Sequence, residues 1–185
     1  EKSRTNELKI KYSFNDTLSF ENIFYRSFIE DALLYDSSFN GGSGYTNNKS
    51  DLKQDGIESN IIFKNNKQKL SFYNTISSSK QTDGSHQLNR PDSTYGINYE
   101  LNLNNSFFGP FDIYYSYKHY GKSFDYAPAV TKVDSTDIMN LSVLKKINIG
   151  VISLKISNLL DEQYQRPHGY SQNGRLFNLG FKLNY

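Results

Sequence analysis

Cysteine and tryptophan are absent from this chain of 185 residues, and proline occurs only four times. The absence of cysteine excludes disulfides, thiolate metal sites and thiol nucleophiles. No run of about 18 apolar residues occurs, which excludes a membrane-spanning helix. The formal net charge of +2 gives no electrostatic argument for nucleic-acid binding, so nucleic acid is not an expected partner.

Aromatic and small polar residues dominate instead, with 15 tyrosines and 13 phenylalanines beside many asparagines and serines. Such a composition favours β structure. The mean hydropathy of −0.68 is compatible with a membrane-spanning barrel, because only alternate residues of each strand face lipid. Residues 1–5 are polar and contain no signal peptide. We therefore expect a chain that has lost its signal or belongs to a longer protein, and favour the latter.

Alternation of apolar and polar residues is the main structural signal, and it recurs along most of the chain. The segment 18–34 is apolar but changes phase near Ile23, which we attribute to a β-bulge. With that segment, the pattern predicts about nine strands of roughly ten residues, a length that suits a tilted strand crossing a bilayer. The other alternating segments cover residues 8–14, 57–63, 70–76, 95–103, 111–117, 139–143, 152–156 and 177–185.

The connections between these segments alternate between short and long, the layout of an outer-membrane barrel with periplasmic turns and longer extracellular loops. Asparagine is frequent in the short turns, where it tolerates a positive φ. The last strand should then run towards the periplasm and end there at Tyr185. The short turns lie at 15–16, 65–67, 104–106 and 148, and the long loops near 36–50, 79–92, 121–135 and 161–173.

The predicted fold class is therefore all-β, an antiparallel transmembrane β-barrel of which about nine strands are present. Closed single-chain bacterial barrels normally have an even number of strands, and a spanning sheet cannot leave an open edge in lipid. We expect residues 1–185 to be the C-terminal part of a larger barrel.

Several short motifs support this prediction. Residues 156–164 read I-S-N-L-L-D-E-Q-Y and are followed by Gly169-Tyr170 and by G-R-L-F at 174–177. These residues resemble the "N-L-F-D-x-x-Y" and "G-Y … G-R" signatures near the end of TonB-dependent outer-membrane receptors. Residues 45–58 and 88–91 resemble two internal motifs of the same family. Within it, the stretch from Tyr164 to Tyr170 is most similar to cobalamin receptors.

The resemblance implies a barrel of about 22 strands with a plug domain, which is absent from residues 1–185. It implies an outer-membrane protein that imports a bulky nutrient, cobalamin or a ferric siderophore. The implied partners are membrane lipid, the TonB energy-coupling protein acting through the plug, and the barrel-assembly machinery. No resident cofactor is implied.

Two sets of residues are functional candidates. Aromatic residues in or beside the long loops could stack on a bulky ligand, or pack the loops against one another; they are Tyr45, Tyr120, Tyr126, Tyr164 and Tyr170. Arg90 and Arg175 could each pin a loop or a strand end by binding several carbonyls. The final strand resembles the signal read by the assembly machinery, carried by Phe177, Leu179, Phe181, Leu183 and Tyr185.

No catalytic or metal-binding pattern stands out, and we predict a protein that is not an enzyme. His86, His119 and His168 are isolated in sequence, and Ser123 and Asp125 near His119 form no recognisable motif. Two other functions remain open. One is a small passive channel; the other is a soluble β-sandwich, whose apolar faces would have to meet across a core.

Overall fold

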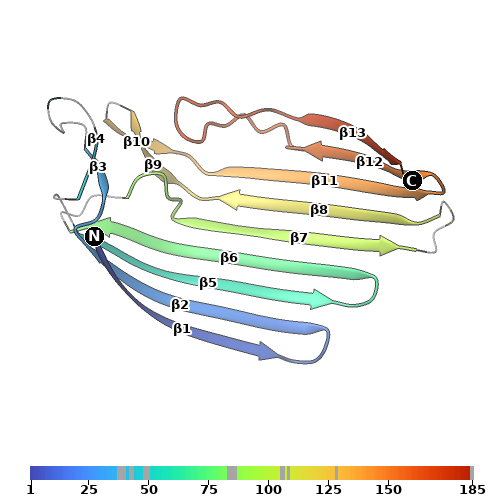
Figure 1. Cartoon of the computed structure of the whole chain (residues 1–185), viewed down its shortest axis with the longest axis horizontal. Coiled ribbons are helices and arrows are strands. Elements are labelled where there is room, and N and C mark those ends of the chain that lie inside the picture. Colours follow the sequence, from blue (N-terminus) through green and yellow to red (C-terminus); the bar gives the residue numbers. More distant parts are fainter. Residues whose placement is uncertain are drawn as a thin grey trace.

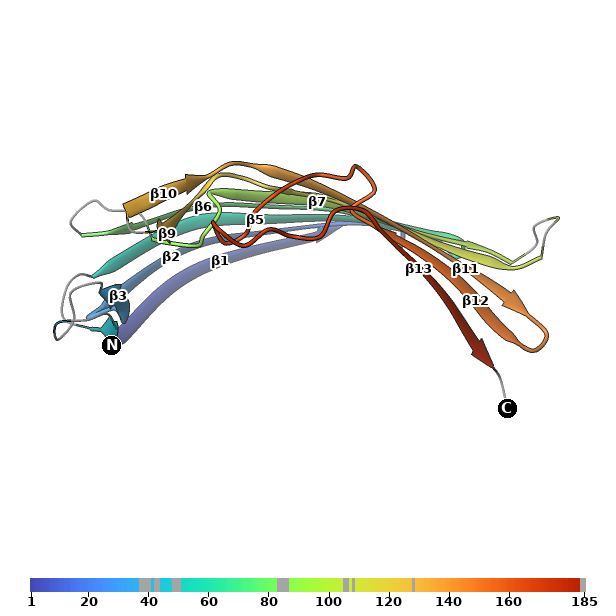
Figure 2. The same ribbon diagram turned by 90° about the horizontal axis from the view of Figure 1, so that it is seen from above.

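Nine antiparallel strands form one curved sheet in the order β1-β2-β5-β6-β7-β8-β11-β12-β13 (Figures 1 and 2). The computed structural model describes residues 1–36, 41, 44–47, 51–82, 87–104, 107, 109–127 and 129–183. The all-β fold and the strand number are as predicted. The strands are β1 (Lys2–Ser13), β2 (Leu18–Glu30), β5 (Leu52–Lys64), β6 (Gln68–Gln81), β7 (Ser93–Leu103), β8 (Phe111–Tyr120), β11 (Thr136–Ile147), β12 (Gly150–Ser157) and β13 (Leu176–Leu183).

Two small hairpins inside the long connections were not predicted. The first pairs β3 (Leu34–Asp36) with β4 (Gly44–Thr46), and the second pairs β9 (Ser123–Ala127) with β10 (Ala129–Val133). Neither belongs to the nine-stranded sheet. Within the described residues, no helix is long and apolar enough to cross a membrane.

The short turns lie at one end of the sheet and the long connections at the other, as the sequence predicted (Figure 1). The role of asparagine in the turns differs from the expectation, because neither Asn15 nor Asn65 has a positive φ. Instead the Asn15 Oδ1 accepts hydrogen bonds from the backbone N–H of Thr17 at 2.9 Å and Leu18 at 2.8 Å. The Asn65 Oδ1 likewise accepts hydrogen bonds from the backbone N–H groups of Lys67 and Gln68. Each side chain therefore closes its turn as a hydrogen-bond acceptor.

One face of the sheet is apolar across its whole width. Directly opposite residues on neighbouring strands share a face, and their side chains touch. Several members of this apolar face are strongly exposed, including Leu8 at 60% and Leu179 at 81%. No second sheet covers them among the residues described, which argues against a β-sandwich. One row across this face runs through Phe63, Leu70, Tyr99, Tyr115, Leu141, Ile156 and Phe177.

The opposite, polar face carries charges and amides. Lys9 forms an ion pair with Glu21 at 3.1 Å, and Lys69 with Glu100 at 3.6 Å. Asn98 lies beside the second pair and contributes to a shallow hollow on this face. Polar residues placed on one face and apolar residues on the other match the inside and outside of a barrel wall.

The predicted bulge in β2 is wrong. The strand pairs one-to-one with β1 and with β5 along its length, without an extra residue on either side. Asn22 lies on the apolar face, whereas Ile23 lies on the polar face opposite Lys9 and Glu58. Two side chains that break the alternation, in a regular backbone, produced the apparent change of phase.

Two glycines on the polar face lie directly opposite tyrosines. Gly56 is opposite Tyr25, and Gly96 is opposite Tyr73. A Cβ atom at either glycine would collide with the facing tyrosine ring. Both rings therefore occupy the space that a side chain on the neighbouring strand would fill.

Candidate ligand-binding site

A cavity of about 610 Å³ lies among the long connections. Tyr120, the last residue of β8, forms part of its wall, together with Tyr164 and Arg166 from the connection between β12 and β13. Ser123 and Asp125 come from β9. Asn89 and Pro91 before β7 and Val133 at the end of β10 also line it, as do Pro167 and Gln172 of the β12–β13 connection.

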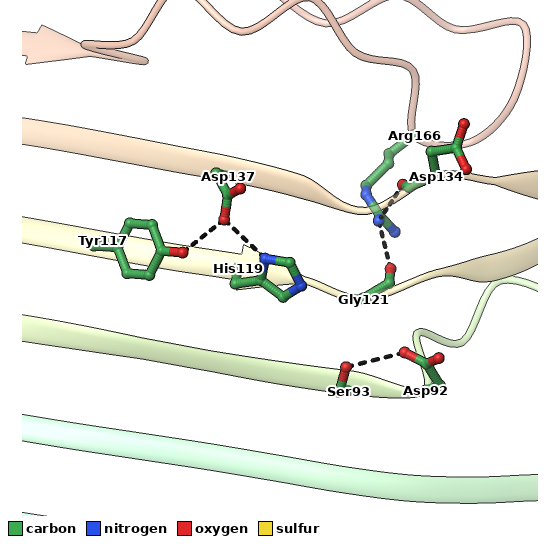
Figure 3. Close-up of polar contacts among 8 residues, drawn as sticks. All are labelled: Asp92, Ser93, Tyr117, His119, Gly121, Asp134, Asp137 and Arg166. Atoms are coloured by element: carbon green, nitrogen blue, oxygen red, sulfur yellow. Dashed lines mark hydrogen bonds and ion pairs between the residues drawn. The ribbon is translucent and has the colours of Figure 1, made fainter.

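Arg166 holds three of these segments together (Figure 3). Its guanidinium donates to the Gly121 carbonyl at 2.8 Å, the Asp134 carbonyl at 3.1 Å and the Ser123 Oγ at 3.4 Å. It also lies over the Tyr120 ring, 4.9 Å from the centroid. Burial lowers the pKa of this guanidinium, but arginine keeps its charge at physiological pH.

One further donor of Arg166, its Nε, is buried and forms no hydrogen bond within the described residues. A buried donor without a partner is unfavourable, and here it belongs to a residue that lines a cavity. Sequence reasoning missed Arg166, since its partners lie 32 to 45 residues away.

Asn158 organises the start of the same connection. It is 5% exposed and has a φ of 51°. Its Nδ2 donates to the carbonyls of Glu162 at 2.9 Å and Asn173 at 3.2 Å, and its Oδ1 accepts from the Glu162 N–H at 3.0 Å. Its own N–H donates to the Asn140 Oδ1 at 3.1 Å, which ties the connection to β11.

The signature residues that follow Asn158 complete this closure. The Asp161 Oδ1 accepts from the Arg175 N–H at 2.7 Å, and the Arg175 Nε donates to the Leu159 carbonyl at 3.0 Å. The Arg175 side chain, beside the start of β13, thus binds one carbonyl among the contacts described, where the sequence led us to expect several. Asn158, Asp161 and Arg175, which belong to the signature stretches, therefore close the base of a long loop. Tyr164 from the same stretch lines the cavity instead.

The five predicted ligand tyrosines do not form one cluster. Tyr120 and Tyr164 share the cavity, whereas Tyr45 in β4 and Tyr170 are 67% and 68% exposed and do not line it. The side chain of Tyr126 lies outside the described residues. The Tyr120 ring also lies under the Lys118 ammonium of its own strand at 4.4 Å and against the Arg166 guanidinium from another connection, so packing within the protein accounts for part of its environment. Ligand contact stays a prediction for all five.

The residues considered for catalysis separate onto different surfaces. The His119 Nδ1 lies 2.8 Å from the Asp137 Oδ1, on the apolar face, where Tyr117 donates to the same oxygen at 2.7 Å (Figure 3). Ser123 contacts Arg166, and the Asp125 Oδ2 accepts from the His168 N–H at 2.6 Å. His86 lies outside the described residues. No group of three or more possible metal-ligating His, Asp or Glu side chains occurs within those that are described.

The final strand presents its apolar residues as predicted. Phe177, Leu179, Phe181 and Leu183 lie on the apolar face of β13, and each is between 47% and 81% exposed. Tyr185 lies outside the described residues. An edge strand with so exposed an apolar face is suited to contact lipid or an assembly factor, and its role as an assembly signal stays a prediction.

No protein-family model matches the sequence, and no curated protein sequence does either. The fold, in contrast, matches solved structures that include an outer-membrane receptor, an uptake receptor and an iron transporter. The pyoverdine outer membrane receptor FpvA of Pseudomonas aeruginosa PAO1 aligns with 99% of this chain at a TM-score of 0.81 and 14% identity. The FrpB iron transporter of Neisseria meningitidis aligns with 96% of this chain at a TM-score of 0.74 and 12% identity. The ferric yersiniabactin uptake receptor FyuA of Yersinia pestis also aligns with 96% of this chain, at a TM-score of 0.73 and 13% identity.

The alignments cover 30%, 30% and 28% of those three receptors, so this chain spans less than a third of their length. They show that the chain has the fold of one section of the receptor barrel wall. The more specific resemblance to cobalamin receptors finds no support in these neighbours, whose names concern iron and siderophores.

Proposed function

We propose that this chain forms the C-terminal part of the barrel of a TonB-dependent receptor in the bacterial outer membrane, and that the receptor imports a ferric siderophore. The observation that carries the proposal is the nine-stranded sheet with one apolar and one polar face, which overlays on receptor barrels along almost its whole length. The apolar face would contact lipid, the long connections would lie outside the cell, and the short turns in the periplasm.

The ligand would reach the receptor at the end that carries the long connections. The cavity between Tyr120, Tyr164 and Arg166 offers two aromatic rings and one buried N–H donor that has no partner among the described residues. Such a lining suits a ligand with flat apolar parts and anionic or carbonyl oxygens, as in a ferric chelate. The iron and siderophore receptors among the structural neighbours support this ligand class. Transport itself would require the TonB protein acting through a plug domain inside the barrel.

Intact cells that produce the protein should bind and accumulate an iron-55 siderophore complex. We would compare a ferric pyoverdine and a ferric catecholate with cyanocobalamin, the other ligand suggested by the sequence. Changing Tyr120 and Tyr164 together to alanine should weaken binding roughly tenfold or more, because two aromatic contacts are lost. Tyr170→Ala is the matched control, since that exposed ring does not line the cavity.

Three other results would change the assignment. Accumulation that continues in cells lacking TonB would indicate a passive channel, the alternative function left open by the sequence. Binding of cyanocobalamin alone would make the protein a cobalamin receptor. Protein found only in the soluble fraction would contradict the outer-membrane proposal altogether.

The final strand should control assembly into the membrane. We expect Phe177→Ser with Phe181→Ser to reduce the folded, membrane-inserted protein several-fold, because both rings face the predicted lipid side of an edge strand. Heat-dependent gel migration of outer-membrane fractions would measure the folded amount. Asn178→Ser with Lys182→Ser, on the polar face of the same strand, is the control. Equal yields of the two double variants would count against the assembly role.

A further inference from the structure

The apolar face changes character towards the long-connection end of strands β1, β2, β5 and β6. One row across these strands runs from Arg4 to Phe28, then to Lys53 and Lys80, each residue directly opposite the next. All four side chains are exposed. We refer to Arg4, Lys53 and Lys80 as the basic row.

The cations of the basic row have no ion-pair partner in the part of the chain that the structure describes. Asp55, one row further along the strands on the same face, is paired with Arg26. Lys53 and Lys80 lie directly opposite each other, an arrangement in which like charges repel. An anion held between them would remove this repulsion.

An apolar hollow of about 950 Å³ lies beside the basic row on the same face. Leu8, Phe24, Ile57 and Ile76 form its apolar part and lie directly opposite one another across the four strands. Its other side is lined by the intervening row, Asn6, Arg26, Asp55 and Ser78. Cations that form no ion pair among the described residues therefore lie one row from the polar side of this hollow and two rows from its apolar part. This arrangement matches the two parts of an amphiphile.

We infer that this surface binds a phosphate-bearing lipid of the outer leaflet, with its phosphate between Lys53 and Lys80 and an acyl chain in the hollow. The inference rests on the proposed function, which places the apolar face in the bilayer and the long connections outside. Exposed lysines near a bilayer surface attract anionic headgroups, and their stems lie along apolar surface. A second copy of this chain would not suit the same place, because it would bring a second basic row against the first.

The site is confined to one half of the sheet. On the same face, the long-connection ends of β8 and β11 carry Tyr117, His119 and Asp137, and the Asp137 carboxylate is hydrogen-bonded to each of the other two side chains. That cluster offers no unpaired lysine or arginine. The lipid phosphate should therefore bind to strands β5 and β6 rather than distribute evenly along the rim.

The test counts lipids on the protein purified from membranes in a neutral detergent. Native mass spectrometry would follow titration with a bisphosphorylated glucosamine-disaccharide lipid, with its dephosphorylated form and with inorganic phosphate. The variant is Lys53→Gln with Lys80→Gln. Its matched control is Lys155→Gln with Lys182→Gln, which removes the same charge from exposed lysines of the polar face.

The wild-type protein and the control should bind one phosphorylated lipid with equal affinity. The Lys53/Lys80 variant should bind it roughly 30-fold more weakly, since each lysine contributes about 1 kcal/mol at an anionic surface. Inorganic phosphate, without an acyl chain, should not bind at the same concentrations. Equal lipid binding by the variant and the wild type, or equal binding of the dephosphorylated lipid, would overturn the inference.

Membrane fractionation of the same samples separates this result from the proposed function. If all proteins reach the outer membrane and the variant keeps its lipid, the lipid site is wrong and the receptor proposal stands. If the wild-type protein does not reach the membrane, both proposals fail.

Discussion

Asn158→Ala should lower the free energy of unfolding by about 3 kcal/mol. The alanine leaves the N–H and carbonyl of Glu162 and the carbonyl of Asn173 without the partners they have now. Leaving buried polar groups unsatisfied costs about 1–3 kcal/mol. The left-handed backbone of residue 158, with a φ of 51°, costs alanine about 1–2 kcal/mol more. Urea unfolding of the refolded protein in detergent, followed by circular dichroism, would measure the loss.

Asn158→Gly separates the two causes. Glycine accepts the left-handed backbone but makes none of the side-chain hydrogen bonds. It should therefore fall between the wild type and the alanine variant, about 1 kcal/mol above the latter. If alanine and glycine were both within about 0.5 kcal/mol of the wild type, a value usual for surface substitutions, the hydrogen bonds of Asn158 would not hold the loop base.

Ile97→Arg should cost about 2–4 kcal/mol, the penalty for a cation on the lipid face of a barrel near the bilayer centre. Ile97 lies on the apolar face of β7, directly opposite Phe72 and Tyr117. Its side chain is 36% exposed in the chain alone, so lipid rather than protein would surround the new charge. Unfolding in lipid vesicles, compared with the wild type, would report the difference.

The neighbouring residue gives a matched control. Asn98 lies on the polar face, opposite Ser71 and Ser116 and within reach of a hollow that also contains Glu58. Asn98→Arg introduces the same side chain one position away and should change stability by about 0.5 kcal/mol or less. Similar losses of stability for the two variants would mean that both faces of the sheet lie in the same environment. The assignment of the apolar face to lipid would then have to be abandoned.

The sequence predicted the architecture well because period-two alternation and the spacing of turns are local signals. A strand such as β13 carries both faces in its own residues, from Phe177 to Leu183. The same reasoning failed at Asn22 and Ile23, where one polar residue on the apolar face and one apolar residue on the polar face imitated a change of backbone phase. Local pattern cannot distinguish an exceptional side chain from a bulge, since only pairing with the neighbouring strand decides it.

The candidate site was predictable only in part, for a related reason. The expectation that aromatic residues of the long loops bind ligand identified Tyr120 and Tyr164, which share a cavity. The sequence could not identify Arg166, because its carbonyl partners lie in other connections. It also associated His119 with Ser123 and Asp125, its neighbours in sequence. The actual partner of His119 is Asp137, which the register between β8 and β11 places directly opposite. The sequence of either strand alone does not determine that register.

The tyrosines opposite Gly56 and Gly96 have a consequence for the width of the channel enclosed by such a wall. A ring that fills the place of a missing side chain lies along the wall instead of projecting from it. Tyr25 and Tyr73 thus add bulk to the inner surface without narrowing the bore by their full length. Glycine at these two positions would therefore keep the interior of the barrel wider for a ligand or a protein segment that moves through it. Alanine at Gly56 would push the Tyr25 ring inwards and narrow the passage there, whereas alanine at Gly96 would collide with the Tyr117 backbone carbonyl as well as with the Tyr73 ring.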